Sequence, residues 1–310
     1  MQDRQVVIGT RASKLALWQS NHIRDRLLGL DASLEIVLER ISTRGDEVQD
    51  RPLAAIGRNS LFVAEIEDAL RSGRIRLAVH SAKDLPSTLP DEFAIVAFTT
   101  RADARDVVVS RHGRLLELPH GARVGTSSPR RACQIKALRP DLVCVDIRGN
   151  VDTRLAKLER GDYDAIVLAA AGLDRLEWSH VVTERLDPDV MLPAVAQGIL
   201  AVEARAGDAE IAALCAALDD ADARACAIAE RSFLAAMGAG CNAPLAGFAV
   251  PRGDLLTLTA LVGAPDGRNV RVQQTAARSA ASALGASVAQ ALIEEGGGDL
   301  LAAEADGRGA

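Results

Sequence analysis

The strongest constraint on the fold is an alternation of two hydrophobic patterns over the first 200 residues of this 310-residue chain. Short runs rich in Val, Ile and Leu alternate with longer segments whose apolar residues have helical spacing. This alternation is typical of strands joined by helices that cover the faces of a parallel sheet. The sequence therefore predicts the α/β fold class with a parallel sheet.

The expected elements follow one another closely along the chain. Strands are expected at residues 5–8, 34–41, 76–79, 94–98, 106–110, 123–125, 142–147, 165–169 and 199–203, and helices between them at 14–28, 62–72, 129–138 and 151–159. After residue 206 the pattern predicts Ala-rich helices at 209–218 and 221–237, strands at 245–250, 255–262 and 269–275, and a helix at 280–294. The last part is expected to form a small α+β domain.

Two segments are predicted to carry the chain between lobes. The polar stretch 99–105 separates two strands without room for a helix, and 192–198 (LPAVAQG) contains a Pro and a Gly before another apolar strand. A chain that leaves one lobe near residue 100 and returns near 195 would form two lobes with a cleft. We expect a first lobe from residues 1–99 with 199–217, a second from 104–192, and a C-terminal domain from 221–310.

Composition argues against a nucleic-acid-binding protein and a membrane-spanning protein. The 36 Lys and Arg against 42 Asp and Glu give a net charge of −6, and 48% apolar with 25% charged residues is ordinary for a globular protein. Only 3% aromatic residues and no basic tail argue against a nucleic-acid partner. The longest apolar stretch, 165–173, is shorter than the ~20 residues of a membrane span. The N-terminal residues lack the pattern of a targeting signal, so we expect a cytoplasmic protein without a membrane partner.

The five cysteines form no C-x-x-C pair, so neither a disulfide framework nor a metal site is expected. Cys133, Cys144, Cys215 and Cys226 are expected to be inert packing residues. Cys241 differs because it follows Gly238-Ala239-Gly240 and precedes Asn242-Ala243-Pro244. Such a turn would expose the thiol, although a small core residue is the other interpretation.

Polar residues follow four of the expected strands. They are the segments 9–13 (GTRAS), 80–86 (HSAKDLP), 126–131 (TSSPRR) and 148–154 (RGNVDTR). Ligands of open α/β sheets bind at the carboxyl ends of the strands, so these segments could meet in one crevice. Residues 126–129 also read as a helix start with free N–H groups, which attracts anions, and Ser127 and Ser128 are expected to be helix caps.

Arginine dominates these segments and their surroundings. The candidates are Arg11, Arg130, Arg131, Arg148, Arg154 and Arg175. Each charged contact to a carboxylate contributes about 1.5–3 kcal/mol, and six are too many for one phosphate, so the set predicts a small polyanion as ligand. A single such Arg would be an ordinary surface charge. His80 is expected to be a hydrogen-bonded structural residue. Asp84 is either the ion partner of a neighbouring cation or the partner of an N–H group of the ligand.

The motifs together resemble the porphobilinogen deaminase family, also called hydroxymethylbilane synthase. The matching segments run in order from residue 6 to about 250: IGTR with LALWQ (8–11 and 15–19), STRGD (42–46), HSAKDLP (80–86), VGTSSPRR (124–131), RGNVDTRL (148–155), LPAVAQG (192–198) and GCNAPL (240–245). One departure is Asn59, which stands in the segment Gly57-Arg58-Asn59-Ser60 where family members commonly carry Lys.

The resemblance implies a transferase of heme and tetrapyrrole biosynthesis. Such an enzyme joins four porphobilinogen molecules head to tail, releases an ammonia at each step, and yields linear hydroxymethylbilane. A dipyrromethane cofactor would be attached through a thioether to Cys241. The implied fold is two lobes like those of type II periplasmic-binding proteins plus a C-terminal α+β domain, and the implied state is a monomer.

The resemblance also implies residue roles. Asp84 matches the catalytic aspartate, which would hydrogen-bond pyrrole nitrogens and stabilise the positive charge that develops when ammonia leaves. The implied cofactor-binding residues besides Cys241 are Lys83, Asp84, Ser13, Ser81, Thr126, Ser128, Arg130, Arg131 and Arg148. Those implied for the substrate are Arg11, Arg148, Arg154 and Arg175.

Two other functions are compatible with parts of the sequence. A non-catalytic two-lobed solute-binding or sensor protein for small polycarboxylates would explain the cleft and the arginines, but not Cys241 in its glycine turn. A degenerate homologue would bind pyrroles without turnover.

Overall fold

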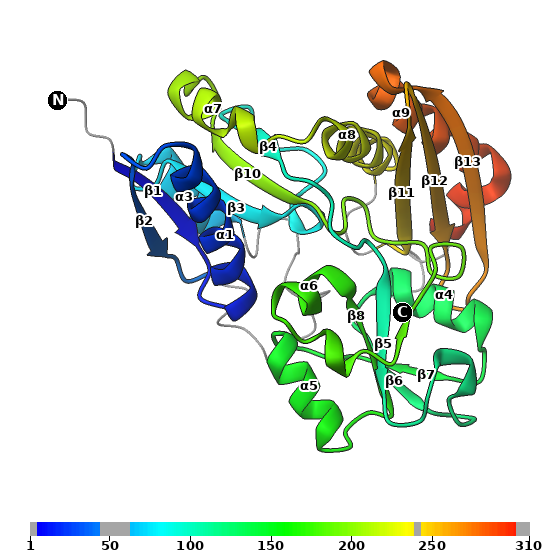
Figure 1. Ribbon diagram of the computed structural model, residues 1–310. Coiled ribbons are helices and arrows are strands. Elements are labelled where there is room, and N and C mark those ends of the chain that lie inside the picture. The colour runs from blue at the N-terminus through cyan, green and yellow to red at the C-terminus, as the bar shows by residue number, and fades with distance from the viewer. Residues whose placement is uncertain (1–4, 44–62, 239–242, 302–310) are drawn as a thin grey trace. The chain divides into compact units, whose positions relative to one another are not determined.

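The computed structural model describes residues 5–43, 63–238 and 243–301. The chain forms two compact units (Figure 1). The first contains Met1–Ala102 and Ile199–Arg224, and the second contains Asp103–Gly198 and Ala225–Ala310. The chain therefore passes between the units after residues 102 and 198, at the two segments that the sequence analysis singled out, and again after residue 224.

The first unit is built on a five-stranded mixed sheet. Its strands are, in spatial order, β2 (Glu35–Arg40), β1 (Gln5–Thr10), β3 (Leu77–Ser81), β10 (Leu200–Arg205) and β4 (Phe93–Phe98). β1 is parallel to β2 and β3, whereas β10 is antiparallel to β3 and β4. The helices of this unit are α1 (Lys14–Leu30), α3 (Ala64–Arg71) and α7 (Ala209–Cys215).

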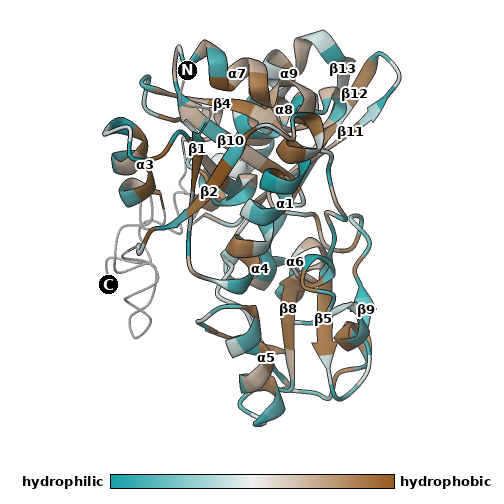
Figure 2. Cartoon of the chain, turned by 60° about the vertical axis from the view of Figure 1, so that its left-hand side comes forward, coloured by the Kyte–Doolittle hydropathy of each residue, from teal (hydrophilic) through white to brown (hydrophobic). Residues whose placement is uncertain are grey.

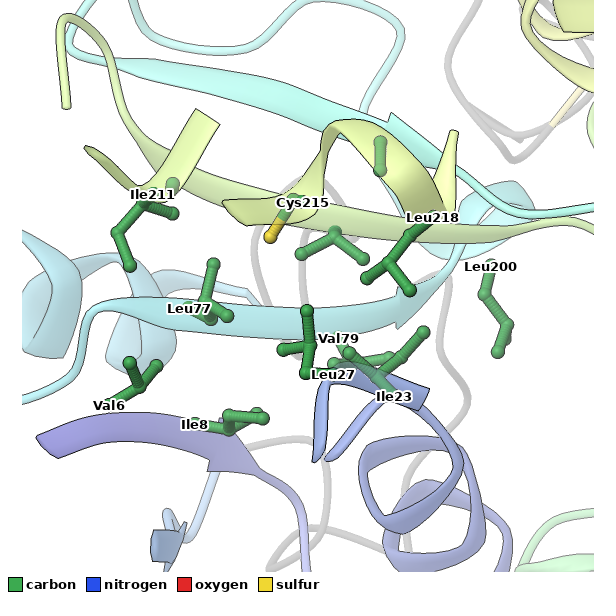
Figure 3. Packing of buried hydrophobic residues seen from close by; sticks show 13 residues of the cluster. Val6, Ile8, Ile23, Leu27, Leu77, Val79, Leu200, Ile211, Cys215 and Leu218 are labelled. Carbon is green, nitrogen blue, oxygen red and sulfur yellow. The ribbon is translucent and has the colours of Figure 1, made fainter. Parts of the chain in front are cut away.

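Alternation of side chains in these strands gives the first unit two cores. On one face Ile23 and Leu27 of α1 pack with Ile8 and Val79 from two strands, and Ile211 of α7 joins the same cluster (Figure 3). All of these side chains are buried, and each such burial contributes about 1.5–3 kcal/mol. The opposite face packs against α3. The sheet is thus fixed from both sides, which holds the ends of β1 and β3 in place.

The second unit has a sheet of the same size. Its strands are, in order, β7 (Val143–Val145), β6 (Arg123–Gly125), β8 (Ala165–Ala169), β5 (Asp106–Ser110) and β9 (Glu184–Arg185). β6 is parallel to β7 and β8, and β5 is antiparallel to β8 and β9. The helices are α4 (Pro129–Leu138), α5 (Val151–Glu159) and α6 (Ala170–Arg175). β5 and β8 are hydrophobic along most of their length because both of their faces are covered (Figure 2).

The C-terminal part of the second unit is an antiparallel meander with helices. α8 (Ala221–Ala236) precedes β11 (Leu245–Arg252), β12 (Leu255–Gly263), β13 (Asn269–Ala277) and α9 (Ala281–Leu292). The apolar stripe of α9, Leu284, Val288 and Leu292, is buried as its spacing predicted. α8 and α9 approach closely at Gly285, where an added Cβ would lie 2.3 Å from the Ala229 carbonyl oxygen.

The prediction of α/β architecture with a C-terminal α+β part is confirmed, but the prediction of a parallel sheet is wrong. Both sheets are mixed, because β5 and β10 enter directly from the segments between the units. A parallel pair requires a crossover connection, and neither strand is joined to its neighbours by one. Two elements were not predicted from the sequence: α6, which continues from β8 without a break, and β9, which has only two residues.

Candidate active site

In the first unit, candidate residues gather at one edge of the sheet. β1 and β3 are parallel neighbours, with Gly9 paired to Ala78, so the segments that follow them leave the sheet at the same edge. Arg11 and Ser13 follow β1, and Ser13 caps α1 by accepting a hydrogen bond from the Ala16 N–H at 3.2 Å. Ser81 ends β3, and its hydroxyl accepts a hydrogen bond from Gln19 Nε2 at 2.9 Å.

Asp84 lies just beyond this edge in a single 3-10 turn, Ala82–Asp84. Ala82 and Leu85 on either side are buried, and the Ala82 N–H donates to the Ile199 carbonyl at 3.0 Å. Lys83 is half-buried and Asp84 is exposed. Within the part of the chain that the structure describes, the Asp84 carboxylate makes no hydrogen bond or ion pair, so the interpretation of Asp84 as a partner of a neighbouring cation gains no support.

In the second unit, hydroxyl side chains surround the start of α4. Pro129 occupies the first turn, and the Ser128 hydroxyl caps the helix by accepting from the Arg131 N–H at 3.4 Å. The Thr126 hydroxyl accepts from the Ser128 N–H at 3.2 Å. The prediction that Ser127 is a helix cap is wrong. Its hydroxyl donates to the Ile147 carbonyl at 2.6 Å and accepts from the Ile147 N–H at 3.0 Å. Ser127 instead ties this turn to the segment that follows β7.

Arg130 and Arg131 are buried around one carboxylate, that of Asp106 at the start of β5. Arg130 Nη1 donates to Asp106 Oδ2 at 2.7 Å, and Arg131 Nη2 donates to Oδ1 at 2.7 Å. Burial alone would raise the pKa of Asp106, but the charges of the two guanidinium groups outweigh it and hold the pKa well below its usual range. The three ionised groups together carry one positive charge, which suits the binding of one further carboxylate.

Polar side chains that were not predicted from the sequence hold residues 192–198 and link them to the cluster of Asp106, Arg130 and Arg131. Gln134 accepts from the Leu192 N–H at 2.7 Å, and Gln197 donates to Asp106 Oδ1 at 3.0 Å. Glu230 of α8 accepts from the N–H of Ala196, whose φ of 58° lies in the left-handed region. No short sequence pattern marks Gln134 or Glu230, because a polar side chain on a helix is usually solvated, and the motif at residues 192–198 contains Gln197 without indicating its partner.

Three further arginines lie on loops or helix ends of the second unit. Arg154 Nε donates to the Gly149 carbonyl at 2.8 Å, and the Arg148 carbonyl accepts from Lys157 Nζ at 3.0 Å. Arg175 donates to the Gly198 carbonyl at 2.8 Å, and burial lowers its pKa to about 10, which still leaves it charged at neutral pH. Arg148 and Arg154 therefore lie together at the start of α5.

Three of the four cysteines in the described residues are buried, as expected for packing residues. Cys133, Cys215 and Cys226 are buried, and Cys144 is half-buried. Burial raises the pKa of Cys215 to about 12, which makes its thiol inert at neutral pH. Cys241 and Asn59 lie outside the described residues.

In residues 5–43, 63–238 and 243–301, no cluster of three or more His, Cys, Asp or Glu side chains could hold a metal ion. None of the helices in those ranges has the length and apolar character needed to cross a membrane.

Both α/β units thus carry cationic and hydroxyl side chains at the ends of their strands, an arrangement typical of α/β proteins whose loops bind anions. Comparison with known proteins shows which family within this class the chain belongs to. The family model "Porphobilinogen deaminase, dipyromethane cofactor binding domain" matches residues 6–213, and "Porphobilinogen deaminase, C-terminal domain" matches residues 224–294. The chain belongs to the porphobilinogen deaminase family, whose members are transferases of tetrapyrrole biosynthesis with a dipyrromethane cofactor.

Curated relatives match over nearly the whole chain. The porphobilinogen deaminase of Roseiflexus castenholzii is 57% identical over 96% of this chain and 98% of its own length. That of Stenotrophomonas maltophilia strain K279a is 51% identical over the same shares, and that of Brevibacillus brevis is 46% identical over 95% of this chain and 96% of its own. Matches of this length extend into the last 60 residues, which the sequence motifs matched only weakly.

The similarity to solved structures is lower. The methionine binding protein MetQ is 12% identical, with a TM-score of 0.45 over 70% of this chain and 90% of that chain. The periplasmic VFT2 domain of BvgS from Bordetella pertussis is 15% identical, with a TM-score of 0.42 over 69% of this chain and 86% of that chain. The predicted α/β class with a small C-terminal α+β domain is confirmed by the two five-stranded sheets, the three-stranded C-terminal sheet and the match to the family's C-terminal domain. The alternative of a solute-binding protein is not favoured.

Proposed function

We propose that this protein condenses four porphobilinogen molecules head to tail into hydroxymethylbilane, with one ammonia released at each step, on a dipyrromethane primer held by a thioether to Cys241. The observation that carries the proposal is the 57% identity to a porphobilinogen deaminase over 96% of the chain. The exposed Asp84 carboxylate, which has no partner among the described residues, gives this function a group that can meet a pyrrole N–H.

The side chains of the second unit fit a ligand with carboxylate arms and pyrrole N–H groups. Arg130 and Arg131 keep a net positive charge beside Asp106 because two guanidinium groups share one carboxylate. The capped start of α4 adds oriented N–H groups and hydroxyls. We assign the binding of the cofactor to Ser13, Ser81, Lys83, Asp84, Thr126, Ser128, Arg130, Arg131 and Arg148.

Asp84 supplies the catalytic electrostatics in this proposal. A carboxylate that accepts hydrogen bonds from pyrrole nitrogens stabilises the positive charge that develops on the substrate as ammonia leaves, without forming a covalent bond. When bound, the dipyrromethane supplies the terminal pyrrole carbon that attacks the substrate. Arg11, Arg148, Arg154 and Arg175 hold the substrate carboxylates and orient the reacting pyrrole.

The proposal includes a cytoplasmic monomer whose partner is the small-molecule substrate, without a nucleic-acid or membrane partner. It also includes three domains. These are a first lobe of residues 1–99 with 199–217, a second lobe of residues 104–192, and a C-terminal domain of residues 221–310 that carries Cys241.

The test is turnover of porphobilinogen by the purified protein. We expect ammonia release together with hydroxymethylbilane formation, whereas a binding protein or a degenerate homologue would bind pyrroles and release no ammonia. Asp84→Ala is expected to lower turnover about a hundred- to a thousandfold while the cofactor stays attached, because removal of one preorganised group from a transition state costs that much. Asp91→Ala, at an exposed carboxylate of the same unit, is the matched control and should keep full activity. Near-normal ammonia release by Asp84→Ala would refute the assigned role.

A further inference from the structure

The first unit contains a buried polar pair that the proposed chemistry does not use. His80 Nε2 and Glu203 Oε2 are hydrogen-bonded at 2.9 Å, and their side chains are 7% and 0% exposed. His80 on β3 is paired with Ala201 on β10, and Glu203 lies two residues further along the same strand. The two side chains therefore lie diagonally across neighbouring strands on one face of the sheet.

Stability alone is a weak explanation for this pair. A buried carboxylate has a high desolvation cost, and packed apolar residues in place of a buried ion pair are often equally or more stable. Among the described residues, the second oxygen of Glu203, Oε1, has no hydrogen-bond partner. Glu67 of α3 adds a further acid nearby, and its pKa is raised first by burial and then by the charge of Glu203. A pair kept despite this cost is better explained by the geometry that it fixes.

The geometry concerned is that of the turn that carries Asp84. His80 immediately precedes Ser81, at the last paired position of β3 against β10, where Ser81 is opposite Leu200. The next N–H, that of Ala82, donates to the Ile199 carbonyl at 3.0 Å. The hydrogen bond between His80 and Glu203 thus joins β3 to β10 two residues before the turn Ala82–Asp84 starts.

We propose that His80 and Glu203 are positioning residues that fix β3 against β10, so that the Asp84 carboxylate stays where it meets the pyrrole nitrogens. This inference rests on the role proposed for Asp84. Neither side chain touches the substrate in this proposal. Both act through the backbone of residues 80–84.

Two amide substitutions of His80 test the proposal as a matched pair. His80→Gln can place an amide nitrogen near the position of Nε2 and keep the bond to Glu203, whereas His80→Asn is one methylene shorter and cannot reach it. We expect His80→Asn to lower kcat about 10- to 100-fold, the loss that follows from a displacement of about 1 Å, with KM changed less than about threefold. His80→Gln should recover most of kcat.

The intact mass and the thermal midpoint of unfolding establish that each variant is folded and carries its cofactor. Should His80→Asn fail to fold, Glu203→Asp shortens the pair from the other side and should show the same loss of kcat. His112→Asn is the control, because His112 lies 3.6 Å from Asp164 in an exposed pair of the second unit and should leave kcat unchanged. Wild-type kcat in both folded His80→Asn and folded Glu203→Asp would overturn the proposal.

A double-mutant cycle separates this inference from the proposed function. In an Asp84→Glu background the carboxylate is already displaced by one methylene, so His80→Asn should cause little further loss. The same fold-loss in both backgrounds would overturn the positioning role while leaving Asp84 as the catalytic group. Wild-type turnover by Asp84→Ala would instead refute the role assigned to Asp84, and the absence of ammonia release by the wild-type protein would refute the proposed function itself.

Discussion

Individual residues of the site differ in how far the sequence predicts them. The segment after β3 identified Asp84 and Lys83, because charged residues directly after a buried strand have no role in packing. The segment after β6 identified Arg130 and Arg131 but not the buried carboxylate between them. Asp106 reads as an ordinary charge at the start of a strand, and its burial depends on α4, a helix that begins more than twenty residues later.

The buried cluster predicts a large effect of Asp106→Asn. Removal of one charge leaves two guanidinium groups buried around a neutral amide, which costs about 3–5 kcal/mol of unfolding free energy at pH 7. Because the pKa of Asp106 is held below its unfolded value, its stabilising contribution is complete above about pH 4 and is lost as the pH falls further. The thermal midpoint of unfolding should therefore drop strongly at pH 7, and the difference from wild type should shrink below about pH 4.

Asp91→Asn serves as the control for this measurement and should leave the midpoint unchanged at both pH values. An Asp106→Asn protein as stable as wild type at pH 7 would mean that the carboxylate does not hold the two arginines together.

At the scale of elements, the periodicity of hydrophobic residues predicted which segments form helices and strands better than it predicted the direction of the strands in the sheets. The α5 helix is expected and observed at residues 151–159. The antiparallel direction of β5 and β10 is set by where the chain passes between the units, and periodicity carries no information on that. The start of α5 depends on Gly149, whose φ of 106° suits glycine, and an added Cβ there would lie 2.7 Å from Thr153 Cγ2.

Gly149→Ala is accordingly expected to displace the segment that carries Arg148 and Arg154, since the Gly149 carbonyl accepts from Arg154 Nε. We expect a loss of about 1–3 kcal/mol in stability from the strained backbone and an increase in KM for porphobilinogen. Gly161→Ala is the matched control, because Gly161 also has positive φ, at 86°, but has open space around it. It should cost similar stability without a change in KM. Equal KM values for the two variants would argue against a role of the α5 start in binding.

At the scale of the whole molecule, the sequence predicted the class of fold and the two segments that link the units. A Pro and a Gly in residues 192–198 and the polar residues 99–105 marked them, because such residues interrupt both helical and strand patterns. The bonds that hold these segments could not be predicted. Gln134 and Glu230 are far from these segments in sequence, and Gln197, which lies within residues 192–198, donates to Asp106, 91 residues earlier in the chain. All three look like solvated residues until the chain is folded.

The central claim is a covalent primer on the sulfur at position 241, and the intact mass of freshly isolated protein tests it most directly. We expect an excess over the sequence mass equal to two pyrrole units in the active protein, and no excess in Cys241→Ser. Cys144→Ser, at a half-buried thiol, should retain the excess. Active wild-type protein with the bare sequence mass, or an adduct that persists on Cys241→Ser, would contradict the account.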